Sequence, residues 1–304
     1  MKKFLIRLTL FALMVSVIVL LLLHFAGGYV DYFYVKFTSK PQKSLILGDS
    51  RSFQGMRPSE INAVTASQFE GPVYNYAFTM AQAAYGDLYL ESVKRKLDPT
   101  TKNGLFILTV QPSLLAQRPG EDPESGKYFE ENVPPHNVLY PNMNPNLEYL
   151  FRNISYFHFK AILKRETRTH KDGWLEEGNI PSDPAEKENI KKRWIERFKG
   201  FGTTWKSSEY RLKKLKETIT FLQEHGTVFL VRMPVSQEFL AVEHDFWQDF
   251  DSRMSALSNE TGSLYLNYAA SQDFETFDGV HLDKSNCIKF SRRLGLDISK
   301  SARK

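Results

Sequence analysis

Two short polar motifs carry side chains that can do nucleophilic chemistry. Gly48-Asp49-Ser50 directly follows an apolar run, and Asp278-Gly279-Val280-His281 lies near the C-terminus. A serine at a sharp turn after a strand can attack a carbonyl carbon when an imidazole accepts its proton. The three-residue spacing lets the Asp278 carboxylate reach Nδ1 of His281, which leaves Nε2 to act as that base. The motifs therefore predict Ser50 as nucleophile, His281 as base and Asp278 as its orienting group.

Each motif also has a plain structural explanation. Asp and Ser are favoured helix caps, so Asp49 and Ser50 equally fit a capped turn between a strand and a helix. Asp278 and His281 equally fit a polar surface turn. The catalytic interpretation is favoured because both motifs occur in order, one after the first expected strand and one ahead of the last expected helix.

Five apolar runs predict the strands that would position these motifs, over residues 44–47, 73–78, 105–110, 227–233 and 263–268. Helical patterns lie between them, over 58–66, 81–97, 210–224 and 237–257, and a last helix follows His281. Strands that alternate with helices indicate a parallel sheet covered on both faces. The sequence thus predicts an α/β fold, a flavodoxin-like three-layer sandwich whose sites form at the carboxyl ends of the strands.

Residues 112 to about 206 interrupt this rhythm. They hold seven prolines between Pro112 and Pro145, then an aromatic patch from Tyr149 to Phe159. We expect one insertion, part loop and part helix, over the top of the sheet. For the aromatic patch, core packing is favoured over stacking on sugar rings. For 191–194, Lys-Lys-Arg-Trp, a solvated helix face is favoured over contact with anionic lipid or polymer.

The first 28 residues predict a membrane anchor. Three cations precede a nineteen-residue apolar run from Leu8 to Ala26, which at about 1.5 Å per residue roughly matches a hydrocarbon core of about 30 Å. A cleaved signal peptide is the alternative, although its apolar region usually has only about 7–15 residues. The leading cations favour a cytoplasmic N-terminus. Residues 29–304 would then form one domain on the extracytoplasmic side of a bacterial inner membrane.

Composition excludes several classes of protein. The single cysteine, Cys287, excludes an internal disulfide, a CxxC redox pair and a cysteine-based zinc cluster. The 40 Lys and Arg against 35 Asp and Glu give a net charge of +5, but no polybasic block dominates, so we expect no nucleic-acid partner. The histidines are scattered without metal-ligand spacing, and we expect neither a metal nor a cofactor.

The two motifs in this order resemble the GDSL/SGNH hydrolase superfamily, which carries its nucleophile in a GDS block after strand one and its base in a DxxH block near the C-terminus. Both blocks match residue for residue, so the resemblance implies Ser50, Asp278 and His281 as a catalytic triad. It covers about 45–111 and 207–298 but not the insertion. The implied activity is that of a serine esterase or acyltransferase.

Two other blocks of that superfamily depart from its pattern. Ala77 stands where the glycine block would have its glycine, and residues 109–112, Thr-Val-Gln-Pro, replace the GxND block. The usual oxyanion asparagine is therefore missing, and Ala77 and Gln111 are the candidate donors in its place. Arg51 and Asn75 are candidates for contact with substrate, with a structural ion pair as the favoured alternative for Arg51.

A GDSR-type block after an N-terminal anchor, the degenerate GxND block and the strand end at 231–234, Val-Arg-Met-Pro, are similar to a membrane-anchored branch of the superfamily, the DltD-like and AlgX/AlgJ-like proteins. This implies O-acylation of an envelope polysaccharide beside a membrane-bound O-acyltransferase. The alternative is a catalytically inactive binding or assembly partner of such a complex, which the degenerate oxyanion region and the long insertion support. A phosphate- or sulfate-ester hydrolase is a weaker option, since it should need a metal cluster.

Overall fold

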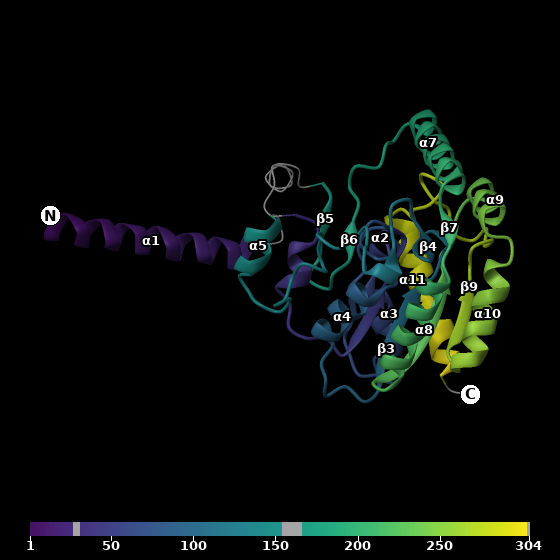
Figure 1. Cartoon of the computed structure of the whole chain (residues 1–304), viewed down its shortest axis with the longest axis horizontal. Coiled ribbons are helices and arrows are strands. Elements are labelled where there is room, and N and C mark those ends of the chain that lie inside the picture. Colours follow the sequence, from purple (N-terminus) through teal and green to yellow (C-terminus); the bar gives the residue numbers. More distant parts are fainter. Residues whose placement is uncertain (27–30, 154–165, 303–304) are drawn as a thin grey trace.

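Five parallel strands form the central sheet of the chain (Figure 1). The computed structural model describes residues 1–26, 31–153 and 166–302. Across the sheet the strand order is β2-β1-β3-β8-β9, and every neighbouring pair is parallel. The strands are β1 (Ser44–Leu47), β2 (Val73–Asn75), β3 (Gly104–Thr109), β8 (Gly226–Arg232) and β9 (Leu264–Asn267). This order confirms the expected α/β, flavodoxin-like fold.

The central strands supply two hydrophobic cores, one on each face. Leu45 and Leu47 of β1 belong to one core, whereas Ile46 belongs to the other. In β3, Phe106 and Ile107 divide in the same way. Because successive side chains of a strand point to opposite faces, a strand covered on both sides is apolar at every position. The unbroken apolar runs in the sequence follow from this arrangement.

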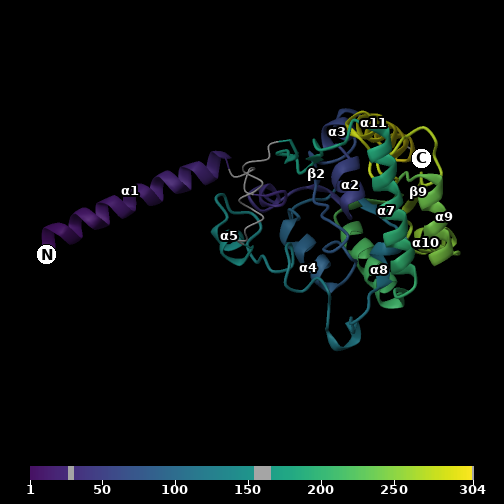
Figure 2. The same ribbon diagram turned by 90° about the horizontal axis from the view of Figure 1, so that it is seen from above.

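Helices cover both faces of the sheet and complete three layers (Figures 1 and 2). Tyr89, Leu215 and Met254 join one core, and Ile61 and Phe290 join the other. The first face thus carries α4 (Asp87–Lys96), α8 (Glu209–Gln223) and α10 (Phe250–Thr261), and the second carries α3 (Pro58–Thr65) and α11 (Lys284–Ser301). Helices α2 (Ser50–Gly55) and α9 (Gln237–Phe246) follow the carboxyl ends of β1 and β8.

The helix expected over 237–257 is two helices, α9 and α10. The chain becomes extended at Trp247, with φ −149° and ψ 87°. Trp247 and Phe250 are both buried, with ring centroids 5.4 Å apart in an edge-to-face arrangement. The break accompanies the burial of these two large side chains in one core, which outweighs the helical pattern of the local sequence.

The helix expected over 81–97 begins only at Asp87, and the strand expected over 73–78 ends as a regular strand at Asn75. Beyond that point the chain still bonds to the first strand and its turn, because the N–H of Tyr76 donates to Ile46 O and that of Phe78 to Gly48 O. A loop over 79–86 follows in place of the first helical turns.

The insertion contains short elements around one long helix. Strand β4 (Ala116–Gln117) pairs with β7 (Lys206–Ser207), and β5 (Arg168–Thr169) pairs with β6 (Leu175–Glu176). Its helices are η3 (Pro112–Leu114), η4 (Pro123–Ser125), α5 (Leu147–Asn153) and α7 (Pro184–Gly202). Tyr149 is buried and stacks on Phe37 at 4.8 Å. Phe151 of the same patch is exposed, so core packing holds for Tyr149 but not for Phe151. Tyr156, Phe157 and Phe159 lie outside the described residues.

The N-terminal segment forms one helix, α1 (Lys2–Ala26), which extends away from the sheet (Figure 1). Its apolar stretch has a mean hydropathy of 2.7 and is exposed throughout. The helix is thus long and apolar enough to cross a membrane. A signal sequence can have the same length and composition. The expected boundary at residue 28 lies outside the described residues. A short 3₁₀ helix, η2 (Tyr34–Phe37), leads into β1.

Candidate active site

A glycine turn places Ser50 at the carboxyl end of β1. Gly48 has φ +138°, and a Cβ at this position would lie 1.7 Å from Oγ1 of Thr109, so only glycine fits. The Asp49 carboxylate then accepts the N–H of Arg51 at 3.0 Å and caps α2. Ser50 is the first residue of that helix, and its own N–H has no acceptor among the described residues.

Ser50, His281 and Asp278 form one continuous chain of contacts. The Ser50 Oγ lies 2.9 Å from Nε2 of His281. On the other side of the ring, Nδ1 lies 2.7 Å from Oδ2 of Asp278. Asp278 and His281 are buried, while Ser50 is half-buried. The structure therefore brings together the three residues that the sequence motifs predict, across 231 positions of the chain between Ser50 and His281.

Asp278 is held as a charged carboxylate. Its Oδ1 accepts the N–H groups of Val280 at 3.0 Å and of His281 at 2.8 Å. Burial would raise the pKa of Asp278, but the His281 ring and these backbone donors outweigh burial and lower that pKa below its ordinary value. A charged Asp278 favours the proton on Nδ1 of His281, so Nε2 is left to accept the proton of the Ser50 hydroxyl.

A cavity of about 330 Å³ opens onto Ser50 and His281. The turn at 49–51 forms one wall and the loop at 79–81 forms another. The third wall is helix α7 of the insertion, through Trp194, Arg197 and Phe198. A cavity of this volume falls in the range of small-molecule sites.

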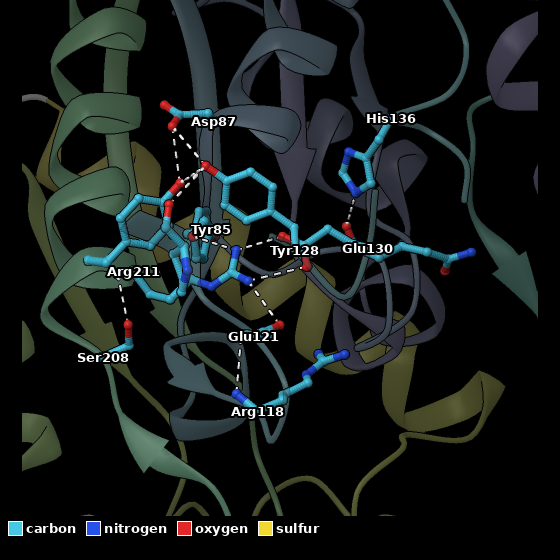
Figure 3. A network of polar contacts seen from close by, with 12 residues as sticks. Tyr85, Asp87, Arg118, Glu121, Tyr128, Glu130, His136, Ser208 and Arg211 are labelled. Carbon is cyan, nitrogen blue, oxygen red and sulfur yellow. Dashed lines mark hydrogen bonds and ion pairs between the residues drawn. The ribbon is translucent and has the colours of Figure 1, made fainter. Parts of the chain in front are cut away.

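Three basic side chains hold the loop at 79–86, and Figure 3 shows the contacts of two of them, His136 and Arg211. Arg118 donates to the carbonyl of Met80, His136 lies 2.7 Å from that of Gln82, and Arg211 donates to that of Tyr85 at 3.2 Å. Arg118 and His136 belong to the insertion, so the insertion fixes a wall of the cavity. The N–H of Met80 has no acceptor within the described part of the chain and is available at this wall.

Arg211 is the centre of a buried charged network (Figure 3). Its guanidinium binds Glu130 at 2.6 Å and Glu121 at 3.1 Å, and Glu121 also accepts the N–H of Arg118 at 3.0 Å. Burial would lower the pKa of Arg211, but the two carboxylates outweigh burial and raise it. Glu121 and Glu130 belong to the insertion, so the network joins the insertion to α8. Removing one partner would cost about 3–5 kcal/mol, because it would leave an uncompensated buried charge.

Ala77 and Asn75, two further residues singled out in the sequence, lie beneath the turn and not at the cavity. The N–H of Ala77 donates to Oδ1 of Asn75 at 3.1 Å. The amide of Asn75 donates to the carbonyls of Ser52 at 2.8 Å and Met56 at 2.9 Å. These contacts give Asn75 the task of holding α2, in place of the expected contact with substrate. Met80, in the loop at 79–86, lines the cavity instead.

Gln111 and Arg51 differ in their access to the cavity. Gln111 is fully buried, does not line the cavity, and its side-chain nitrogen and oxygen have no partners among the described residues. Arg51 lines the cavity, but its Nη2 binds the buried Glu243 at 2.6 Å, and Glu243 also binds Arg232 at 3.1 Å. Burial would raise the pKa of Glu243, yet the two arginines lower it. The ion pair expected as the alternative for Arg51 is therefore present.

The sequence does not predict the α7 wall as part of the site. Trp194, expected on a solvated face, has its ring centroid 5.9 Å from that of His281. Trp194 and Phe198 pack on the buried cluster of Val235, Phe239 and Val280. The apolar residues at 194, 198 and 201 follow the i, i+4, i+7 spacing of a buried helix face, and that signal could have revealed the wall.

Cys287, the one thiol of the chain, offers no competing nucleophile. It is buried, and burial raises its pKa to about 12. Among residues 1–26, 31–153 and 166–302, no three His, Cys, Asp or Glu side chains gather as metal ligands. Ser50 is thus the candidate nucleophile of this cavity.

No family model and no curated protein matches the chain. Several solved structures are similar in fold at very low identity. Est24, a carbohydrate acetylesterase from Sinorhizobium meliloti, is 9% identical with a TM-score of 0.41, and the match covers 84% of this chain and 98% of that one. The inhibitor-bound M. smegmatis aryl esterase is 10% identical, with coverage of 87% and 99% and a TM-score of 0.39. Phospholipase A1 from Streptomyces albidoflavus is 12% identical, with coverage of 84% and 98% and a TM-score of 0.37. Likeness of this degree concerns the fold and carries no inference about activity.

Proposed function

We propose that this chain is a serine acyl-ester hydrolase or O-acyltransferase of the SGNH/GDSL type, which acts on an extracytoplasmic polysaccharide of a bacterial cell envelope. The observation that carries the proposal is the unbroken contact from Ser50 Oγ through His281 to Asp278 at the edge of a cavity. These two distances, 2.9 and 2.7 Å, are those of a nucleophile, its general base and the group that orients the base.

The first half of the reaction forms an acyl-enzyme. The Ser50 Oγ attacks the ester carbonyl carbon while its proton passes to Nε2 of His281, and Asp278 stabilises the imidazolium that results. The tetrahedral intermediate then collapses, the carbon–oxygen bond to the alcohol breaks, and His281 returns the proton to the departing alkoxide oxygen. The acyl group remains on Ser50.

The second half releases the acyl group to an oxygen nucleophile. His281 takes a proton from water in an esterase, or from a sugar hydroxyl in a transferase, as that oxygen attacks the acyl carbon. Collapse of this intermediate breaks the bond to Oγ, and His281 returns the proton to Ser50. Helix α7 would influence the choice between water and sugar, because it forms one wall of the cavity in which either must reach the acyl carbon.

The negative oxygen of both intermediates needs donors in place of the missing asparagine. We assign this task to the backbone N–H groups of Ser50 and Met80, since both residues line the cavity and neither N–H has an acceptor in the described part of the chain. Backbone donors fixed in advance are effective because they need no reorganisation as charge develops. In this assignment Met80 replaces Ala77 and Gln111 as the second donor.

Helix α1 would anchor the domain at the outer face of the inner membrane, near a membrane-bound O-acyltransferase as partner. Its length and apolar composition support the anchor, and the cations at Lys2, Lys3 and Arg7 support a cytoplasmic N-terminus. A domain anchored in this way would meet the polymer at the membrane surface, where the membrane-bound O-acyltransferase would supply acyl groups.

A second candidate function is that of a non-catalytic binding partner in the same acylation complex. Gln111 favours it, because this residue stands where the oxyanion asparagine is expected but is buried away from the cavity. A scaffold has no need for an activated serine, so the reactivity of Ser50 distinguishes the two functions.

The test is acetate release from acetylated oligosaccharides by the full-length chain in detergent micelles. We expect release by the wild-type chain and its loss in Ser50→Ala and His281→Ala. Ser255→Ala and His244→Ala are matched controls, since both side chains are exposed and belong to α10 and α9. When a second, unacetylated oligosaccharide is added, acetylated acceptor marks a transferase and free acetate marks an esterase. Absence of both products with every donor would contradict the enzymatic proposal.

A further inference from the structure

Helix α7 is a surface helix that nevertheless forms a wall of the catalytic cavity. None of its residues is fully buried, yet its apolar stripe packs on the cluster formed by Val235, Phe239 and Val280. Figures 1 and 2 show α7 beside α9 at the carboxyl side of the sheet. Its side chains at the cavity are therefore fixed in place by packing, while their outer ends remain open to solvent.

Arg197 of α7 is such a side chain. Its guanidinium lies 5.4 Å from the ring of Trp194 and 5.4 Å from that of Phe201, and Arg197 lines the same cavity as Ser50. Two aromatic rings restrict the rotamers of an exposed arginine, so less conformational entropy is lost when the guanidinium binds a ligand. The rings of Trp194 and His281 pack edge-to-face with their centroids 5.9 Å apart, which places Trp194 and Arg197 next to the proposed catalytic base.

Arg197 has no carboxylate partner in the described part of the chain, in contrast to Lys191 and Lys199 of the same helix. Lys191 of the same helix binds Glu188 and Glu238. Lys199 binds Glu196. The Arg197 guanidinium is therefore positioned by two rings, exposed to solvent and without a carboxylate partner. A cation in this state can bind an anion without first giving up another ion pair.

The other charged groups of the cavity do not oppose an anion at Arg197. Asp49 and Asp278 are buried, and their carboxylates accept hydrogen bonds from Arg51 N–H and from His281. The charge of Arg51 is compensated by Glu243. Arg197 is thus the exposed, uncompensated charge among the described residues that line the cavity.

We propose that Trp194 and Arg197 form a subsite for a sugar ring that carries an anionic group, a carboxylate or a phosphate, next to the scissile ester. This rests on the proposed function, because it names the class of substrate for the same serine. The Trp194 ring contacts the apolar face of the sugar, and the Arg197 guanidinium donates paired hydrogen bonds to the anionic oxygens. The polysaccharide is therefore acidic.

The experiment uses three acetyl esters that differ only at C6 of the sugar. These are 3-O-acetyl methyl glucoside, the matching glucuronide and the matching glucoside 6-phosphate. The readout is kcat/KM for release of the deacetylated sugar by the full-length chain in micelles, at low and at high salt. We expect about three- to tenfold higher kcat/KM for the charged esters, mainly through KM, and a smaller preference at high salt. The glucuronide and the phosphate arms show which anion is preferred.

Arg197→Gln should abolish the preference, and Arg197→Lys should retain only part of it, because lysine lacks the paired donors. Arg193→Gln is the matched control one turn earlier, since Arg193 is exposed and does not line the cavity. Equal rates for all three esters with the wild-type chain, or an unchanged preference in Arg197→Gln, would overturn the inference while leaving the serine mechanism intact. Failure to cleave any of the three would instead count against the proposed function.

Discussion

The carbonyl of Met80, at the wall of the catalytic cavity, accepts a hydrogen bond from the guanidinium of Arg118, which belongs to the insertion. Arg118 itself lies between two aromatic rings, 4.7 Å from Phe129 and 4.9 Å from Trp205. The insertion therefore helps to orient the peptide groups around Met80. Substitutions in the insertion should accordingly affect the rate of acyl transfer at Ser50.

We expect Arg118→Met to lower kcat about tenfold or more with a smaller change in KM. Without Arg118 the Met80 peptide can turn, and its N–H then no longer stabilises the negative oxygen that develops in the transition state. Arg118→Lys should restore part of kcat, since an ammonium can still reach the Met80 carbonyl. Steady-state kinetics on an acetyl ester, with circular dichroism to verify folding, provides the measurement. An unchanged kcat in folded Arg118→Met would show that Met80 is not held for catalysis.

The substitution Asp278→Asn tests the orientation of the base. The amide that replaces the carboxylate can keep the shape of the turn, but it no longer favours the proton on Nδ1 of His281 or stabilises the imidazolium. We expect kcat to fall by a factor of about 10³–10⁴ while KM changes little. Kinetics on the same ester, compared with Asp283→Asn as a control carboxylate that only caps α11, would reveal the difference. A loss below tenfold would argue against the assigned role.

The turn before Ser50 should tolerate only glycine. Gly48→Ala places a Cβ against Thr109 in backbone at φ +138°, so we expect a loss of about 3 kcal/mol or more in the free energy of unfolding. Gly120→Ala is the matched control, because Gly120 also has positive φ, at +83°, but has no atom within 4 Å of the added Cβ. Its cost should be about 1 kcal/mol. Thermal unfolding followed by tryptophan fluorescence compares the two, and equal costs would contradict the steric explanation.

Much of the framework follows from local sequence. The five apolar runs correspond to the five strands. A strand buried on both faces is apolar at every position, as Leu45, Ile46 and Leu47 of β1 show, whereas the edge strand β9 is only partly covered. Ser50 and the 278–281 motif could also be found, since each sits in a turn whose geometry is set by its own residues.

The remaining features depend on contacts between distant segments. The local sequence of residues 79–86 predicts the start of a helix. The segment is instead a loop, held by His136 and Arg211, which are 54 and 126 positions from the residues that they contact. Trp194 lies on a helix rich in charge, and only its packing against Val280 and His281 gives it a place in the site. Local patterns do not identify such partners. The spacing of residues 194, 198 and 201 indicates a buried helix face but not its position beside His281, and nothing local to Met80 indicates its place at the cavity.

Covalent labelling of the full-length chain by a fluorophosphonate, read by intact mass and by peptide mapping, measures directly whether Ser50 is activated. We expect one adduct on Ser50, which is lost in His281→Ala and in Ser50→Ala and is retained in Ser255→Ala. A folded wild-type chain without an adduct, or one labelled equally with and without His281, would contradict an activated serine and favour the non-catalytic alternative.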